Sequence, residues 1–219
     1  MELKGKTVLF LGDSITQGGE ASCPENIYWQ VFGRNTGAHV WADGISGTRI
    51  AANQAPEAPG FEHLSRYFAS RVPDMPDKAD AVVVFGGTND FNFSDAPLGT
   101  MADRKPATFY GALHCLYRAL LEKYPTAEIV VMTPTHRCEE DAPVNALGIR
   151  TAACLKRYVE AIREVAEYYG LPVLNLYAMG GIQPEVPIIR EGFMPDGLHP
   201  SDAGHARIAS RLAGFLRTL

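Results

Sequence analysis

The 219-residue sequence has no run of about 18 uninterrupted apolar residues, so no segment is expected to cross a membrane as a helix. Its first residues, MELKGKT, lack the apolar stretch and small-residue cleavage site of a secretory signal. The 20 Lys and Arg against 25 Asp and Glu give a net charge of -5, without the basic excess that binding to a phosphate backbone requires. These absences predict a cytoplasmic protein with no membrane span and no nucleic-acid partner.

Cysteine is also scarce, and no two of the four cysteines have the CxxC spacing of a zinc knuckle or a redox pair. We therefore expect the four to be small buried hydrophobic residues: Cys23, Cys115, Cys138 and Cys154. The contents of 46% hydrophobic and 21% charged residues are ordinary for a folded chain and exclude disorder or a coiled coil. The length favours one domain over residues 1–219.

Short apolar runs rich in β-formers recur along the chain, each closed by turn or polar residues. They predict strands at 7–11, 38–42, 81–85, 129–132 and 173–176. Helical periodicity in between predicts helices at 28–35, 61–71, 108–124, 147–169 and 201–219, and segments rich in Pro and Gly predict loops at 54–60, 72–77 and 180–195. This alternation predicts an α/β fold, a doubly wound parallel sheet of five strands with helices on both faces.

Polar clusters follow the strands, where ligands bind in open parallel sheets. They are Gly12-Asp13-Ser14-Ile15-Thr16, Asp43-Gly44-Ile45-Ser46-Gly47-Thr48 and Gly86-Gly87-Thr88-Asn89-Asp90, with Asp196-Gly197-Leu198-His199-Pro200 before the last helix. Together they contain the parts that acyl transfer needs: a nucleophile, a base, a group that orients the base, and donors for an oxyanion.

The residue types assign these parts to particular side chains. Ser14 stands at a sharp strand exit, where its hydroxyl can face a cleft. Asp196 and His199 are three residues apart, so in one compact turn the carboxylate can bond Nδ1–H and leave Nε2 to take the proton of Ser14. The expected oxyanion donors are the backbone N–H groups of Gly47 and Ser14 and the side-chain amide of Asn89.

In these four clusters and their order, the sequence resembles the SGNH hydrolase superfamily, the GDSL esterases and lipases. The resemblance implies a flavodoxin-like three-layer αβα sandwich, Ser14 as nucleophile, His199 as general base and Asp196 as its orienter. It further implies Gly47 and Asn89 in the oxyanion hole, and neither a metal nor an organic cofactor. The sequence departs from the family at Asp43-Gly44 and Thr48, none of which is expected to touch the reacting atoms.

Further residues on the same edge are candidates for contact with the substrate. His136 follows the fourth predicted strand, and Arg49 lies two residues after Gly47, where it could meet an acidic substrate group. Ordinary surface roles compete in both cases: a solvated loop histidine and an ion pair with a carboxylate of the protein. The segments 91–98 and 184–195 are expected to be loops that shape the acyl or alcohol pocket.

The expected activity is metal-independent hydrolysis of carboxylic esters through an acyl-enzyme, on small-molecule substrates with short acyl groups such as acetylated carbohydrates. Hydrolysis of longer acyl chains, as by a lysophospholipase or thioesterase, is the alternative substrate class. Two further readings are a metal-dependent phosphoesterase that uses Asp13, Asp90, Asp196 and His199, and a receiver-like module with Asp13 as phosphate acceptor.

Overall fold

The computed structural model describes residues 1–53, 58–144, 148 and 151–219. Its sheet is made of β1 (Thr7–Gly12), β2 (His39–Gly44), β3 (Ala81–Phe85), β4 (Glu128–Met132) and β5 (Val173–Leu174). All pairings are parallel, and the strand order is β2-β1-β3-β4-β5. This is the flavodoxin-like order of a doubly wound sheet, so the fold predicted from the sequence is confirmed.

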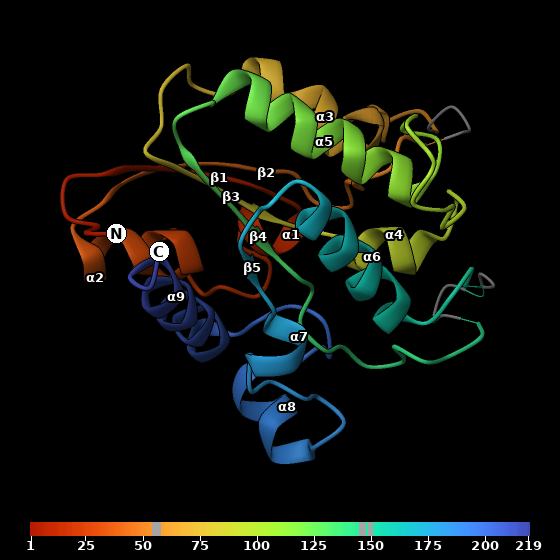
Figure 1. Ribbon diagram of the computed structural model, residues 1–219. Coiled ribbons are helices and arrows are strands. Elements are labelled where there is room, and N and C mark those ends of the chain that lie inside the picture. The colour runs from red at the N-terminus through yellow and green to blue at the C-terminus, as the bar shows by residue number, and fades with distance from the viewer. Residues whose placement is uncertain (54–57, 145–147, 149–150) are drawn as a thin grey trace.

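Helices cover both faces of the sheet (Figure 1). One face packs against α3 (Phe68–Arg71), α5 (Phe109–Lys123) and α6 (Leu155–Tyr168), and the other packs against α2 (Tyr28–Thr36) and α9 (Asp202–Leu216). Because side chains alternate along a strand, Leu9 and Leu11 of β1 enter the first core and Val8 and Phe10 enter the second.

Shorter helices lie in the connections. The α-helical ones are α1 (Ser14–Gln17), α4 (Thr88–Phe93), α7 (Leu176–Met179) and α8 (Pro187–Phe193); 3-10 turns cover Pro24–Asn26, Glu62–Ser65 and Val72–Asp74. α1 and α4 begin directly after β1 and β3 and so lie at the carboxyl ends of the central strands.

Two of the predicted helices are much shorter than expected. Over 61–71 the chain forms a 3-10 turn and then α3, because the N–H of Phe68 donates to the carbonyl of Arg49 and interrupts the helical ladder. Over 147–169 the helix α6 begins only at Leu155; Thr151 and Ala152 instead donate their N–H groups to Pro143 O and Ser94 Oγ. The expected start at 147 and the neighbouring 149–150 lie outside the described residues.

Four other expected segments need correction. The strand predicted at 173–176 ends at Leu174, because the Asn175 side chain caps α7. The loops predicted at 180–195 and 184–195 contain α8, whose first residue is Pro187; proline suits that position because its fixed φ is helical and the missing N–H has no partner there anyway. Segment 91–98 likewise begins inside α4.

The cysteines are not the buried hydrophobic residues that we expected. All four are free thiols of intermediate exposure, and none belongs to either core. Cys23 and Cys154 immediately precede helical segments, Cys138 lies in a loop, and Cys115 lies in the middle of α5. In the part of the chain that is described, no helix is both long and apolar enough to cross a membrane.

Candidate active site

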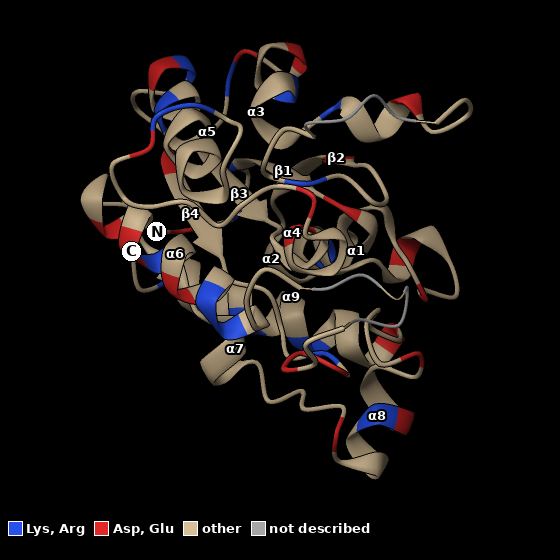
Figure 2. Ribbon diagram, turned by 90° about the vertical axis from the view of Figure 1, so that its right-hand side faces the viewer, with Lys and Arg blue, Asp and Glu red and all other residues tan. Residues whose placement is uncertain are grey.

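The predicted site residues gather at the carboxyl end of the sheet. Figure 2 looks onto this side of the molecule, with α1 and α4 near the centre of the view. Acidic and basic segments are interspersed there, and Lys and Arg do not form a broad band among the described residues.

Ser14 is the first residue of α1 and follows β1 almost immediately. The Asp13 side chain caps this short helix by accepting the N–H of Ile15 at 3.0 Å. Gly12 must be glycine, because a Cβ there would lie 1.9 Å from Thr16 Oγ1 and 3.0 Å from the Phe85 carbonyl. Gly12 therefore lets the chain turn sharply at the end of β1, close to Thr16 and to Phe85 of β3. Ser14 follows this turn at the sheet edge and is 8% exposed.

His199 and Asp196 come from the segment between α8 and α9. The Ser14 Oγ lies 2.9 Å from His199 Nε2, and His199 Nδ1 lies 2.6 Å from Asp196 Oδ2. The structure therefore brings together three side chains of which the first and last are 185 positions apart.

Asp196 is held in place by the turn that it caps. Its Oδ1 accepts the backbone N–H groups of Leu198 at 2.8 Å and His199 at 2.6 Å. Partial burial favours the neutral acid, but the hydrogen bonds from the His199 ring and these N–H groups outweigh it, so the pKa of Asp196 lies below its usual value. A carboxylate opposite Nδ1 selects the tautomer with the proton on Nδ1 and a lone pair on Nε2.

The loop after β2 carries the predicted oxyanion donor Gly47. Gly47 has φ +75°, in the left-handed region that glycine adopts most readily. Asn89 Nδ2 donates to the carbonyl of Thr48 at 3.1 Å, so one amide hydrogen holds this loop and the other is left for a ligand. Among the described residues, none accepts a hydrogen bond from the N–H of Gly47.

Asp90 anchors the far end of the same loop. Its two carboxylate oxygens accept the N–H groups of Ile50 at 3.0 Å and Ala51 at 2.8 Å. Complete burial raises the pKa of Asp90 to about 7 despite these bonds. Burial likewise raises the pKa of Asp13 to about 6. Both carboxyls face backbone donors, and no three His, Cys, Asp or Glu side chains of the described chain are grouped as metal ligands would be.

The two candidate substrate contacts are engaged by other protein groups. Arg49 is 4% exposed, pairs with the carboxylate of Asp95 and stacks on the Phe93 ring. His136 places Nδ1 2.8 Å from Glu140 Oε1, and its ring lies 3.9 Å from that of Tyr177, centroid to centroid. Arg49 thus makes the ion pair that we weighed as its alternative role, and His136 is held by Glu140.

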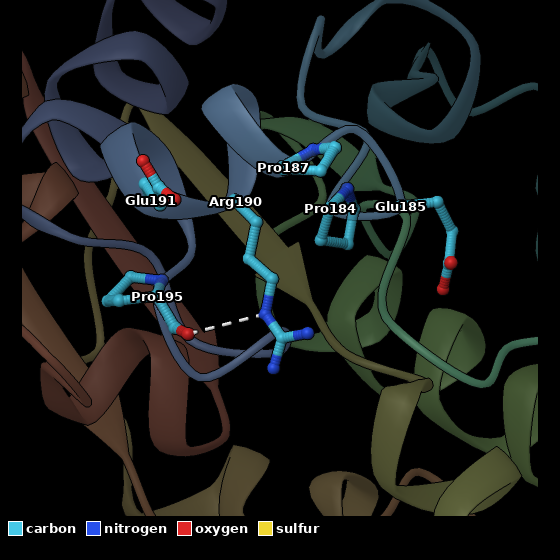
Figure 3. A pocket seen from close by; sticks show the side chains of 6 residues that line it. All are labelled: Pro184, Glu185, Pro187, Arg190, Glu191 and Pro195. Atoms are coloured by element: carbon cyan, nitrogen blue, oxygen red, sulfur yellow. Dashed lines mark hydrogen bonds between the residues drawn. The ribbon is translucent and has the colours of Figure 1, made fainter.

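A cavity of about 320 Å³ opens beside Ser14 and His199. The remaining residues that line it are small or polar: Gln17, Gly18, Gly19, Glu20 and Ser46. A second cavity, of about 560 Å³, lies over α8 and contains neither Ser14 nor His199 (Figure 3). There Arg190 Nε donates to the Pro195 carbonyl at 3.4 Å.

Sequence reasoning missed two kinds of site residue. Gln17, Gly19 and Glu20 line the cavity and immediately follow the Ser14 cluster, so their position in the sequence could have indicated them. Arg71 contacts the loops of the site from α3, and no motif in the sequence marks it.

Histidine 205 contacts the backbone of Gly19, which lines the cavity, and its burial leads to a prediction about stability. It is fully buried; Nδ1 accepts the N–H of Tyr28, and Nε2 faces the carbonyl of Gly19, both at 3.2 Å. Burial holds the pKa of His205 below its usual value. As pH falls through about 6.5, His205 therefore binds a proton in the unfolded chain but stays neutral in the folded protein. Protonation of the unfolded chain lowers the free energy of unfolding, so the protein becomes less stable as pH falls.

We expect His205→Asn, which cannot titrate, to remove this pH dependence. The difference in Tm between wild type and variant should shrink as pH falls from about 7.5 to about 5.5, the range that spans the ordinary titration of histidine. Thermal melts of both proteins at several pH values measure it. A difference that stays constant over this range would show that His205 contributes nothing to the pH dependence.

The sheet order, the serine at the exit of β1 and its link to a histidine before the last helix define the class: an α/β protein of SGNH hydrolase fold. The family model of the GDSL-like Lipase/Acylhydrolase family matches residues 10–207. The chain belongs to this family, and it is a hydrolase of the acylhydrolase and esterase kind.

Solved structures share this fold. A protein from Lactobacillus plantarum is 31% identical, with a TM-score of 0.81 over 99% of this chain and 98% of that one. A candidate GDSL-like lipase from Bacteroides uniformis (20% identity, TM-score 0.70, 98% and 97% covered) has the same fold. So does the salicylyl-acyltransferase SsfX3 of a tetracycline biosynthetic pathway (20%, 0.66, 98% and 55%). Among curated proteins, none matches the sequence significantly.

Proposed function

We propose that this protein hydrolyses carboxylic esters through an acyl-enzyme formed on Ser14, with His199 as general base and Asp196 as its orienter. The observation that carries the proposal is the continuous chain of hydrogen-bonding contacts, 2.9 Å from Ser14 Oγ to His199 Nε2 and 2.6 Å from His199 Nδ1 to Asp196 Oδ2. A nucleophile within reach of a base, and a base held by a third group, is the geometry that acyl transfer uses.

The steps follow from the tautomer that Asp196 favours. His199 Nε2 takes the hydroxyl proton as Ser14 Oγ attacks the ester carbonyl, and the imidazolium is stabilised by the Asp196 carboxylate. His199 then gives the proton to the departing alkoxide, and the acyl group remains on Ser14. A water molecule activated by the same nitrogen hydrolyses the acyl-enzyme and restores the free serine.

Negative charge develops on the carbonyl oxygen during both attacks. The donors that we assign to it are the N–H groups of Ser14 and Gly47 and the second amide hydrogen of Asn89. Donors fixed by the fold stabilise such an oxyanion strongly, because they need no reorganisation during the reaction. The hydrogen bond from Asn89 to Thr48 O supports this role, since it orients the amide before a substrate arrives.

We propose short acyl esters, including acetylated carbohydrates, as substrates. A cavity of about 320 Å³ is at the small end for ligand sites. Its lining of Gln17, Glu20 and Ser46 provides polar contacts and no large apolar wall, which suits a hydroxyl-rich alcohol better than a long acyl chain.

A panel of aryl esters from two to sixteen acyl carbons, run beside acetylated saccharides, tests the substrate class. We expect kcat/KM to be highest for acetyl esters and to fall as the chain lengthens. A maximum at eight or more carbons would contradict the short-acyl proposal and favour a lysophospholipase or thioesterase. The Ser14→Ala protein serves as the blank for each ester.

Asparagine 89 gives a quantitative test of the oxyanion hole. We expect Asn89→Ala to lower kcat by about 100- to 1000-fold with little change in KM, since the lost donor acts mainly in the transition state. Steady-state kinetics on an aryl acetate measure both constants. Asn35→Ala, an exposed position in α2, is the matched control. A kcat for Asn89→Ala equal to that of the control would exclude Asn89 from the hole.

A further inference from the structure

Arg71 is a fully buried cation beneath the loops of the site. It is the last residue of α3, and none of its surface is exposed. Its guanidinium lies 4.7 Å from the centre of the Phe68 ring. Burial lowers the pKa of Arg71 to about 10, which still leaves it charged near neutral pH. Burying a charge is costly, so the contacts that it makes are of interest.

The guanidinium hydrogen-bonds three segments of the site. Nη2 donates to the Gly12 carbonyl at 2.9 Å and approaches Thr48 Oγ1 at 3.4 Å. Nη1 donates to the Asp43 carbonyl at 3.3 Å and lies 3.5 Å from Asp43 Oδ1. Nε is buried and has no hydrogen-bond partner among the described residues. The planar fork of arginine can reach these acceptors together, whereas a single ammonium group presents one point of charge.

These contacts join the two segments from which the proposed backbone oxyanion donors, the N–H groups of Ser14 and Gly47, come. Gly12 lies two residues before Ser14, and Thr48 directly follows Gly47. Thr48 is hydrogen-bonded at two points: Asn89 donates to its carbonyl, and Arg71 approaches its hydroxyl. One side chain thus contacts both the segment before Ser14 and the residue after Gly47.

We propose that Arg71 is a positioning residue that sets the geometry of the oxyanion hole by tying the turn before Ser14 to the loop of Gly47. The inference rests on the proposed esterase function. Arg71 does not contact substrate, so its loss should impair the transition state more than the binding of the ester.

The test compares Arg71→Met and Arg71→Lys with wild type on an aryl acetate. Circular dichroism and melting curves establish how much of each protein is folded. Per folded molecule, we expect kcat to fall by about 10- to 100-fold with KM within about threefold, and lysine to restore little of the loss. Arg66→Met is the matched control, because it removes an exposed arginine of the same segment whose side chain pairs with Asp74.

Addition of a small guanidinium ion to Arg71→Ala gives a second readout, with neutral urea of similar shape as the control. We expect guanidinium to raise kcat several-fold and urea to leave it unchanged, a response that loss of general stability would not produce. If Arg71→Met does not fold, Thr48→Val against Thr48→Ser tests the other end of the contact. Valine should lower kcat severalfold, and serine should not.

The inference is overturned if folded Arg71→Met retains wild-type kcat. It is also overturned if the loss of activity is explained by a higher KM together with a smaller folded fraction, or if guanidinium and urea have the same effect on kcat. Equal kcat for the two Thr48 variants would also overturn it. Wild type and Ser14→Ala are measured in parallel. If wild type is inactive, or Ser14→Ala is active, the proposed function fails and the inference fails with it. If wild type is active and Ser14→Ala is inactive, the result for the Arg71 variants tests the inference alone.

Discussion

Ser14→Ala should abolish ester hydrolysis while the protein remains folded. The substitution removes the atom that we propose to carry the acyl group, and in the described part of the chain Ser14 Oγ hydrogen-bonds His199 and no residue of either core. We expect kcat on an aryl acetate to fall by at least about 10,000-fold. The melting temperature should change little, since a hydroxyl at the sheet edge contributes little to either core.

The matched control for this variant is Ser70→Ala, which removes an exposed hydroxyl that donates to the Tyr67 carbonyl. Its activity should equal that of wild type. Labelling with a fluorophosphonate adds an independent measurement: wild type and Ser70→Ala should gain one adduct, and Ser14→Ala none. If folded Ser14→Ala keeps its activity or its label, another residue is the nucleophile.

Asp196→Asn should have the second largest effect. The amide keeps an oxygen for the backbone N–H groups of Leu198 and His199, but it cannot stabilise an imidazolium, and its NH₂ group favours the wrong tautomer of His199. We expect kcat to fall by about 100- to 10,000-fold, with KM nearly unchanged. The lower figure applies if solvent screens the carboxylate, whose side chain is 37% exposed.

Asp202→Asn is the matched control for this second variant. It removes the carboxylate at the first position of α9, which binds Ser22 and Asn26 and does not touch His199. Its kcat should remain within about threefold of wild type. A pH profile adds detail, because the tautomer argument predicts that Asp196→Asn is impaired across the whole active range. Full activity of Asp196→Asn at any pH would show that His199 is not oriented by this carboxylate.

Much of the local structure was predictable because it is set by short-range patterns. The apolar runs identified the central strands β1, β3 and β4, since a strand buried on both faces is apolar almost throughout. The edge strand β2 is only partly buried and includes His39 and Asp43, yet its apolar residues also indicated a strand. Ser201 was expected to begin the last helix, and it caps α9 by accepting the N–H of Gly204 at 3.3 Å. Helix bounds failed where distant partners took the backbone groups, as at Phe68 and Ala152.

The candidate site divides in the same way. Its motifs each lie within a few residues, so the sequence alone determined that Ser14, Gly47, Asn89, Asp196 and His199 follow strands or precede the last helix, and hence that they meet at one edge of a parallel sheet. Periodicity and turn chemistry are local properties, and the convergence of strand ends follows from the topology that they predict.

Only the tertiary structure decided which polar residues remain available to a ligand. Arg49 and His136 lie at the predicted edge of the sheet, yet Arg49 pairs with Asp95 and His136 contacts the Glu140 carboxylate. Arg71, in contrast, contacts the site from a helix that no sequence motif marks. The physical reason is that a buried charge or donor must find partners, and those partners come from wherever packing places them. Sequence spacing carries no record of such contacts between residues far apart in the chain.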